Sequence, residues 1–141
     1  SKGGNFMPGV SPLPNGTFPQ EIVERLEYAG KWLKVNGEAI FETRPWNVFS
    51  DGENVRFTRT KDGAHVYAIS LKWPGEALTL RSLRAREGSQ VTMLGVNTPL
   101  KWRQHRDGLV IQIPDAIAQN KPCMQAYVFK IEAQPYRPTY D

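Results

Sequence analysis

The chain has 141 residues, of which 40% are hydrophobic and 23% charged, and its formal net charge is +4. This composition is typical of a folded domain, and the length favours one main domain with its own core. The length excludes a complete (β/α)8 barrel, which needs roughly 200 residues or more.

The first expected unit, residues 1–37, combines a strand with a helix. The apolar side chains of Phe6, Met7 and Val10 favour a buried strand within residues 1–11, although the prolines around them keep it short. A helix is expected over residues 18–35. Its start is marked by Pro19 in the first helical position and Thr17 as the better capping residue.

An apolar stripe at helical spacing supports this helix, with Ile22, Leu26 and Leu33 on one face. Asn36-Gly37 is expected to end it. Residues 38–50 are apolar without a regular period, which indicates an irregular connector pinned between two units.

Residues 51–133 alternate between apolar and polar side chains with the period of two that strands require. Turn signals such as Asp62-Gly63 and Asp107-Gly108 recur every 8–12 residues or so. The pattern predicts an antiparallel, Greek-key-like β-sandwich of about seven or eight strands. The fold class is therefore expected to be mainly β, and residues 134–141 are expected to form an extended tail.

Several classes of function are disfavoured by what the sequence lacks. It has no apolar run long enough to span a membrane and no signal peptide at its start. Cys123 is the only cysteine, and the two histidines lack metal-ligand spacing, so no metal or cofactor is expected. The clustered arginines and lysines are not interleaved with stacking aromatics, so no nucleic-acid partner is expected either.

Catalytic groups do not converge in the sequence. Glycosidic hydrolysis usually uses two carboxyl groups about 5–10 Å apart, but the acidic residues fall on a helix face, in Asp-Gly turns and near strand ends. Trp73 and Trp102, both at strand ends, are candidates for stacking against a sugar. The alternative is that both indoles pack in the core, as tryptophan usually does.

The motifs of the first fifty residues resemble the α-L-fucosidases of glycoside hydrolase family twenty-nine. The resemblance rests on Ser1-Lys2-Gly3-Gly4-Asn5, on the run GKWLKVNGEAI over residues 30–40, and on Thr43-Arg44-Pro45-Trp46. Later motifs, including Met93-Leu94-Gly95, are similar to the C-terminal sandwich of that family. One departure is that Pro8 and Ser11 replace the residues expected after the Gly-Gly-Asn strand.

The resemblance implies that residues 1–11 and 18–35 are the last strand and helix of a catalytic barrel. It also implies a retaining, cofactor-free exo-α-L-fucosidase as the parent enzyme, in a secreted, periplasmic or lysosomal location. The nucleophile and the acid/base residue of the family lie on earlier barrel strands, so this chain is expected to be inactive alone. Its candidate interdomain packing residues are Trp32, Asn36, Gly37, Glu38, Arg44, Pro45 and Trp46.

The leading hypothesis is therefore a non-catalytic C-terminal portion that supports the missing N-terminal barrel. Two alternatives stay open. One is a carbohydrate-binding module for fucosylated glycans, and the other is an interaction domain that docks the missing barrel in trans.

Overall fold

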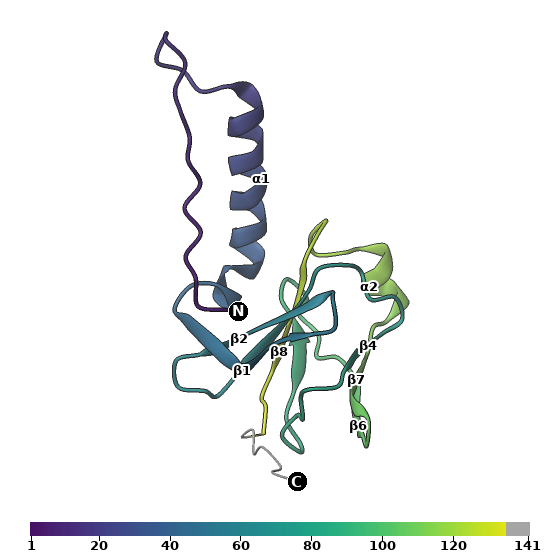
Figure 1. The fold of residues 1–141 in the computed structure, drawn as a ribbon. Helices are drawn as coiled ribbons and strands as arrows, with labels where there is room; N and C mark the ends of the chain where they lie inside the picture. Colours follow the sequence, from purple (N-terminus) through teal and green to yellow (C-terminus); the bar gives the residue numbers. More distant parts are fainter. Residues whose placement is uncertain (135–141) are drawn as a thin grey trace.

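The fold consists of a β-sandwich and a long helix that projects from it. The computed structural model describes residues 1–134, so all but the first residue of the expected tail lies outside the described part (Figure 1). In the same view, helix α1 (Gln20–Asn36) stands on the sandwich at one end only. None of the helices among these residues is long and apolar enough to cross a bilayer.

The predicted mainly β sandwich is confirmed, with two antiparallel sheets. The larger sheet has the strand order β1-β2-β3-β8-β5, and the smaller has β4-β7-β6. Neighbours that are distant in sequence, such as β3 and β8, make the topology more complex than a chain of hairpins. The strand bounds are β1 Thr43–Asp51, β2 Val55–Thr60, β3 Val66–Ser70, β4 Ala77–Leu80, β5 Val91–Met93, β6 Trp102–His105, β7 Gly108–Gln112 and β8 Tyr127–Ile131.

The main core lies between the two sheets and is built from inward-facing apolar residues. Phe57, Leu80, Ile111 and Phe129 are fully buried there. Trp46 packs edge-on against Phe57, with ring centroids 4.9 Å apart, a favoured geometry for aromatic pairs.

The larger sheet is also covered on its outer face, where α1 ends. A second buried cluster combines Tyr67 and Ile69 of β3 with Val128 of β8 and Ala39 of η1 (Gly37–Ala39), a short 3-10 helix that follows α1. As a result, every residue of β3 is buried. This outer cluster is what fixes the helix to the sandwich.

Two local expectations were wrong. The connector expected over residues 38–50 contains β1, an edge strand whose periodicity is broken by Pro45 and by a register shift between Pro45 and Ser50. An edge strand tolerates proline, which cannot donate to the ladder. A five-residue helix, α2 (Asp115–Gln119), follows Pro114 where no helix was expected.

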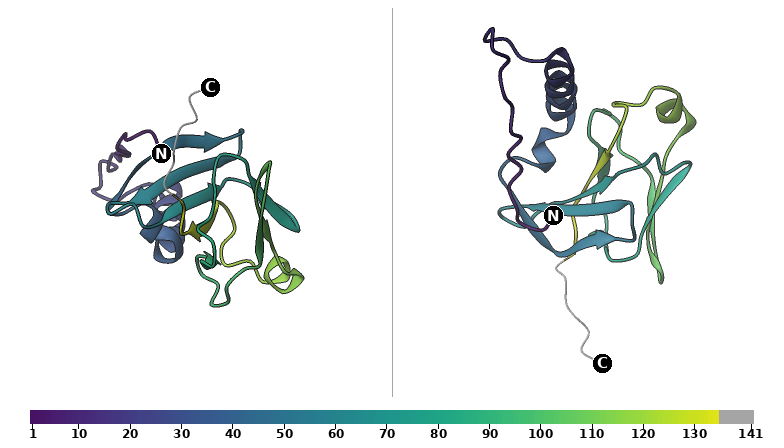
Figure 2. Two further views of the ribbon diagram at one scale, coloured as in Figure 1. Left: turned by 90° about the horizontal axis from the view of Figure 1, so that it is seen from below. Right: turned by 45° about the horizontal axis from the view of Figure 1, so that its top comes forward.

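Residues 1–11 run extended but pair with no strand of the described chain, so their place as a barrel strand stays a prediction. They lie alongside α1 and lead to a turn at its far end, as two further views show (Figure 2). The helix begins after Pro19. Thr17 does not cap it, since the Thr17 hydroxyl donates to Asn15 Oδ1 at 2.8 Å.

Candidate functional site

The last turns of α1 are joined to the sandwich through Trp32. Its indole Nε1 donates to the carbonyl oxygens of Gln125 at 2.8 Å and Ala126 at 2.9 Å. Both acceptors lie just before β8, and Ala126 has the unusual backbone angle φ 52°. One side chain thus ties the helix to the segment that leads into β8, which lies between β3 and β5 in the larger sheet.

The residues after Trp32 continue this junction. Asn36 is fully buried, and its Nδ2 donates to the Trp32 carbonyl at 3.3 Å. The carbonyl of Ala39 accepts a hydrogen bond from the buried Thr58 hydroxyl at 2.7 Å. A Cβ at Gly37 would lie 2.9 Å from the ring of Phe41, a side chain that is 61% exposed.

A charged contact closes the junction at Glu38. Glu38 Oε1 accepts a hydrogen bond from the Tyr67 hydroxyl at 2.7 Å and forms an ion pair with Lys130 Nζ at 2.5 Å. Burial acts to raise the pKa of Glu38, but the bonds from Lys130 and Tyr67 outweigh it and hold that pKa below its usual value. Burial and the Glu38 carboxylate raise the pKa of Tyr67. Glu38 is therefore held in its ionised form.

The sandwich also approaches the helix closely at Gly95. Its φ of +82° is a conformation that favours glycine, and a Cβ there would lie 2.7 Å from both Val35 Cγ1 and Pro122 Cβ. We call the contacts of Trp32, Asn36, Glu38 and Gly95 with their partners the helix–sandwich junction.

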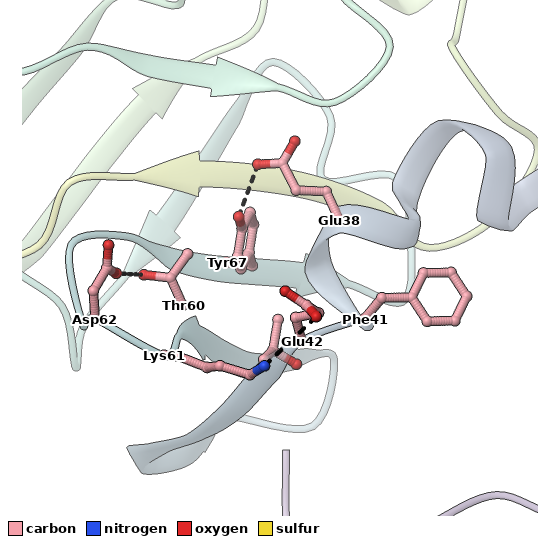
Figure 3. A pocket seen from close by; sticks show the side chains of 8 residues that line it. Glu38, Phe41, Glu42, Thr60, Lys61, Asp62 and Tyr67 are labelled. Carbon is pink, nitrogen blue, oxygen red and sulfur yellow. Dashed lines mark hydrogen bonds and ion pairs between the residues drawn. The ribbon is translucent and has the colours of Figure 1, made fainter.

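A shallow pocket of about 390 Å³ lies beside this junction (Figure 3). Three carboxylates line it, and each is engaged by protein groups. Glu38 is bound as above, Glu42 lies 3.6 Å from Lys61 Nζ, and Asp62 accepts from the Thr60 hydroxyl at 2.5 Å. Carboxylates held in this way stabilise local structure and are poorly placed to act as a catalytic pair.

We expect Glu38→Gln to weaken the fold in a pH-dependent way. Because the folded-state pKa of Glu38 is lowered, its ionised form contributes stability above about the ordinary value of 4.5, and this is lost as the pH falls through the folded-state pKa. Urea unfolding should show a loss of up to about 1 kcal/mol near neutral pH and a smaller loss in acid. The more exposed Glu42→Gln is the control and should change neither curve; equal losses at both pH values for Glu38→Gln would contradict the assignment.

The structure brings four of the seven candidate packing residues together. Trp32, Asn36, Gly37 and Glu38 all lie at the helix–sandwich junction. The other three lie on β1, where Arg44 and Pro45 are exposed and Trp46 belongs to the main core. A role for these residues in packing between domains stays a prediction.

Trp73 and Trp102, the candidates for sugar stacking, are both engaged in packing. The ring of Trp73 meets Tyr127 edge-on with centroids 4.8 Å apart, and Lys121 Nζ lies 4.9 Å from its centroid. The Trp102 indole donates to the Ser89 carbonyl at 3.0 Å, and its ring packs against the main core. Carbohydrate binding at either residue stays a prediction.

Sequence reasoning missed the sandwich side of the junction. Tyr67 and Lys130 are adjacent across the β3–β8 ladder, but they are far apart in the chain. The sequence did single out Gly95, because it belongs to Met93-Leu94-Gly95, one of the motifs that supported the resemblance. Its close approach to Val35 could not be read from that motif.

Comparisons with known proteins bear on both parts of the chain. The model of the α-L-fucosidase C-terminal domain matches residues 50–132, and the α-L-fucosidase model matches residues 1–38. The α-L-fucosidase of Branchiostoma floridae is 38% identical over 94% of this chain, and human tissue α-L-fucosidase is 36% identical over 93%. The chain spans 30% and 28% of the length of these two relatives.

Solved structures agree with the sequence relatives. The crystal structure of Thermotoga maritima α-fucosidase in complex with a mechanism-based inhibitor matches with a TM-score of 0.74 and 26% identity. The match covers 87% of this chain and 29% of that one. The predicted resemblance is thus confirmed by sequence and by structure: the chain carries the C-terminal domain of the α-L-fucosidases and belongs to that family.

Proposed function

We propose that this chain is the C-terminal portion of an α-L-fucosidase and that its task is to hold the last helix of the catalytic barrel in place. In this proposal, residues 1–37 complete the barrel and the sandwich is the rigid base from which they project. The groups that cleave the fucoside belong to the barrel. The chain is then a structural part of a glycoside hydrolase that is inactive alone.

One observation carries this proposal: α1 is firmly docked at one end and uncovered along the rest. Trp32 and Glu38 bind the sandwich and Asn36 is buried beside them, whereas apolar side chains further from the sandwich are exposed. Their exposed fractions are 92% for Phe6, 91% for Met7, 51% for Phe18, 47% for Leu26 and 41% for Tyr28. So many apolar side chains on one projecting unit indicate a surface that is covered by another part of a protein.

The segment before the helix is also tied to the sandwich at its base. Lys2 Nζ lies 4.8 Å from the centroid of the Phe49 ring, a cation–π distance. Gly3 approaches Pro45 so closely that a Cβ would lie 3.3 Å from Pro45 Cγ. The extended segment and α1, which together form the projecting unit, are therefore both attached to the sandwich.

A groove of about 590 Å³ lies between the extended segment before the helix and α1, and apolar side chains from both line it. Phe6 contributes from the extended segment, Leu33 from α1, and Phe41 and Pro45 from the sandwich side. A closed barrel would fill such a groove, because its last strand and helix are flanked by other strands and helices. This supports the barrel as the partner of residues 1–37.

The test is a fusion with the barrel of a relative. The Branchiostoma floridae α-L-fucosidase would be cut where the match to this chain begins, and the chain would be joined in its place. We expect the fusion to hydrolyse a nitrophenyl α-L-fucoside, and the isolated barrel and isolated chain to show no turnover. Hydrolysis by the pure isolated chain would overturn the proposal, and so would a well-folded fusion without activity.

A further inference from the structure

The turn at the far end of α1 is the part of the chain furthest from the sandwich (Figures 1 and 2). Residues 1–12 lead up to it and α1 leads back from it. The helix has 17 residues, so its two ends are separated by about 25 Å at a rise of 1.5 Å per residue. The turn and the sandwich therefore lie at opposite ends of the projecting unit.

Residues 13–17 form this turn and are held by their own hydrogen bonds. The Leu13 amide donates to the Thr17 carbonyl at 2.7 Å, and the Gly16 amide donates to the Leu13 carbonyl at 2.9 Å. Asn15 Oδ1 accepts from the Thr17 amide at 3.1 Å and from the Thr17 hydroxyl at 2.8 Å. The backbone is thus shaped before any ligand arrives, and the side chains of Leu13 and Pro14 remain exposed.

The direction of the chain decides which face of the barrel this turn occupies. If residues 1–37 are the last strand and helix of a barrel, as proposed above, the turn follows a strand and precedes a helix. Loops of that kind build the active-site face of (β/α)8 barrels. The sandwich would then lie at the opposite end of the projecting unit from this face.

We infer that the 13–17 turn forms part of the rim of the active site and contacts the sugar from which fucose is released. Leu13 offers an apolar surface of the kind that packs against the C–H face of a sugar ring. The inference rests on the proposed function and adds that this turn takes part in selecting the glycan.

Two substrates with different leaving groups separate this role from a structural one. α-L-Fucosyl fluoride has a single atom as its leaving group, whereas a fucosylated lactose has a disaccharide. In the active fusion enzyme described above, Leu13→Ala should lower kcat/KM for fucosyl-lactose about fivefold, mainly through KM. For fucosyl fluoride the change should stay within about twofold.

Leu71→Ala is the matched control, because Leu71 is 45% exposed on the sandwich and Leu13 is 43% exposed in the turn. It should change neither rate, and Leu13→Ser should repeat the selective loss seen with Leu13→Ala. Equal losses on both substrates, or no loss on either, would overturn the inference. A wild-type fusion that cleaves neither substrate would instead refute the proposed function.

Discussion

Gly95→Ala should destabilise the chain by about 3 kcal/mol because it pushes α1 away from the sandwich. About 1 kcal/mol of this is the cost of placing a side chain at positive φ. The remainder comes from the new Cβ, which would lie 2.7 Å from Val35 of the helix and from Pro122, and overpacking of this kind typically costs 1–3 kcal/mol. Urea unfolding followed by circular dichroism measures the loss.

Gly75→Ala is the matched control for this substitution. Gly75 has φ +83°, almost equal to the +82° of Gly95, but no atom lies within 4 Å of a Cβ there. Gly75→Ala should therefore lower the free energy of unfolding only by the cost of placing a side chain at positive φ, about 1 kcal/mol. Equal losses at the two glycines would show that the helix does not press on the sandwich at Gly95.

Leu26→Asp should hardly change the stability of the isolated chain, but it should strongly reduce the activity or the folding of the active fusion enzyme. Leu26 is 47% exposed on α1, so the isolated chain loses little beyond helix propensity, less than about 1 kcal/mol. If residues 1–37 complete the barrel as proposed, the same position faces the barrel in the assembled enzyme, where an unpaired buried charge costs several kcal/mol. We expect at least about a tenfold loss of fucosidase activity or of correctly folded enzyme.

Lys31→Asp serves as the control for Leu26→Asp. Lys31 is exposed on the same helix and lies about 140° around its axis from Leu26, given 3.6 residues per turn. It should leave both stability and activity nearly unchanged. A fusion that tolerated Leu26→Asp as well as Lys31→Asp would show that the apolar stripe does not face the barrel.

The parts of the fold that were predicted well are those that depend on local pattern. Ile22, Leu26 and Leu33 repeat at helical spacing, and the strands after residue 51 alternate with period two, so the helix and most of the sandwich follow from the sequence. β1 does not, because Pro45 and the adjoining register shift interrupt its alternation. Its pairing with β2 is what makes it a strand.

Only the helix side of the helix–sandwich junction could be predicted, because only that side lies within one local motif. Trp32, Asn36, Gly37 and Glu38 stand close together in a distinctive motif, and the resemblance marked them as packing residues. Their partners Lys130 and Ala126 are about ninety residues away and enter only through the β3–β8 pairing. No local pattern in the chain shows that a lysine on β8 will meet Glu38 in the short helix just after α1.

If residues 1–37 complete a catalytic barrel while the sandwich holds them in position, the barrel cannot work without them. The test compares the fucosidase activity of the fusion carrying the whole chain with that of a fusion carrying residues 38–141 alone, both shown to contain a folded sandwich. We expect nitrophenyl α-L-fucoside hydrolysis from the first and none from the second. Equal activity of the two fusions would show that residues 1–37 are not needed to complete the barrel.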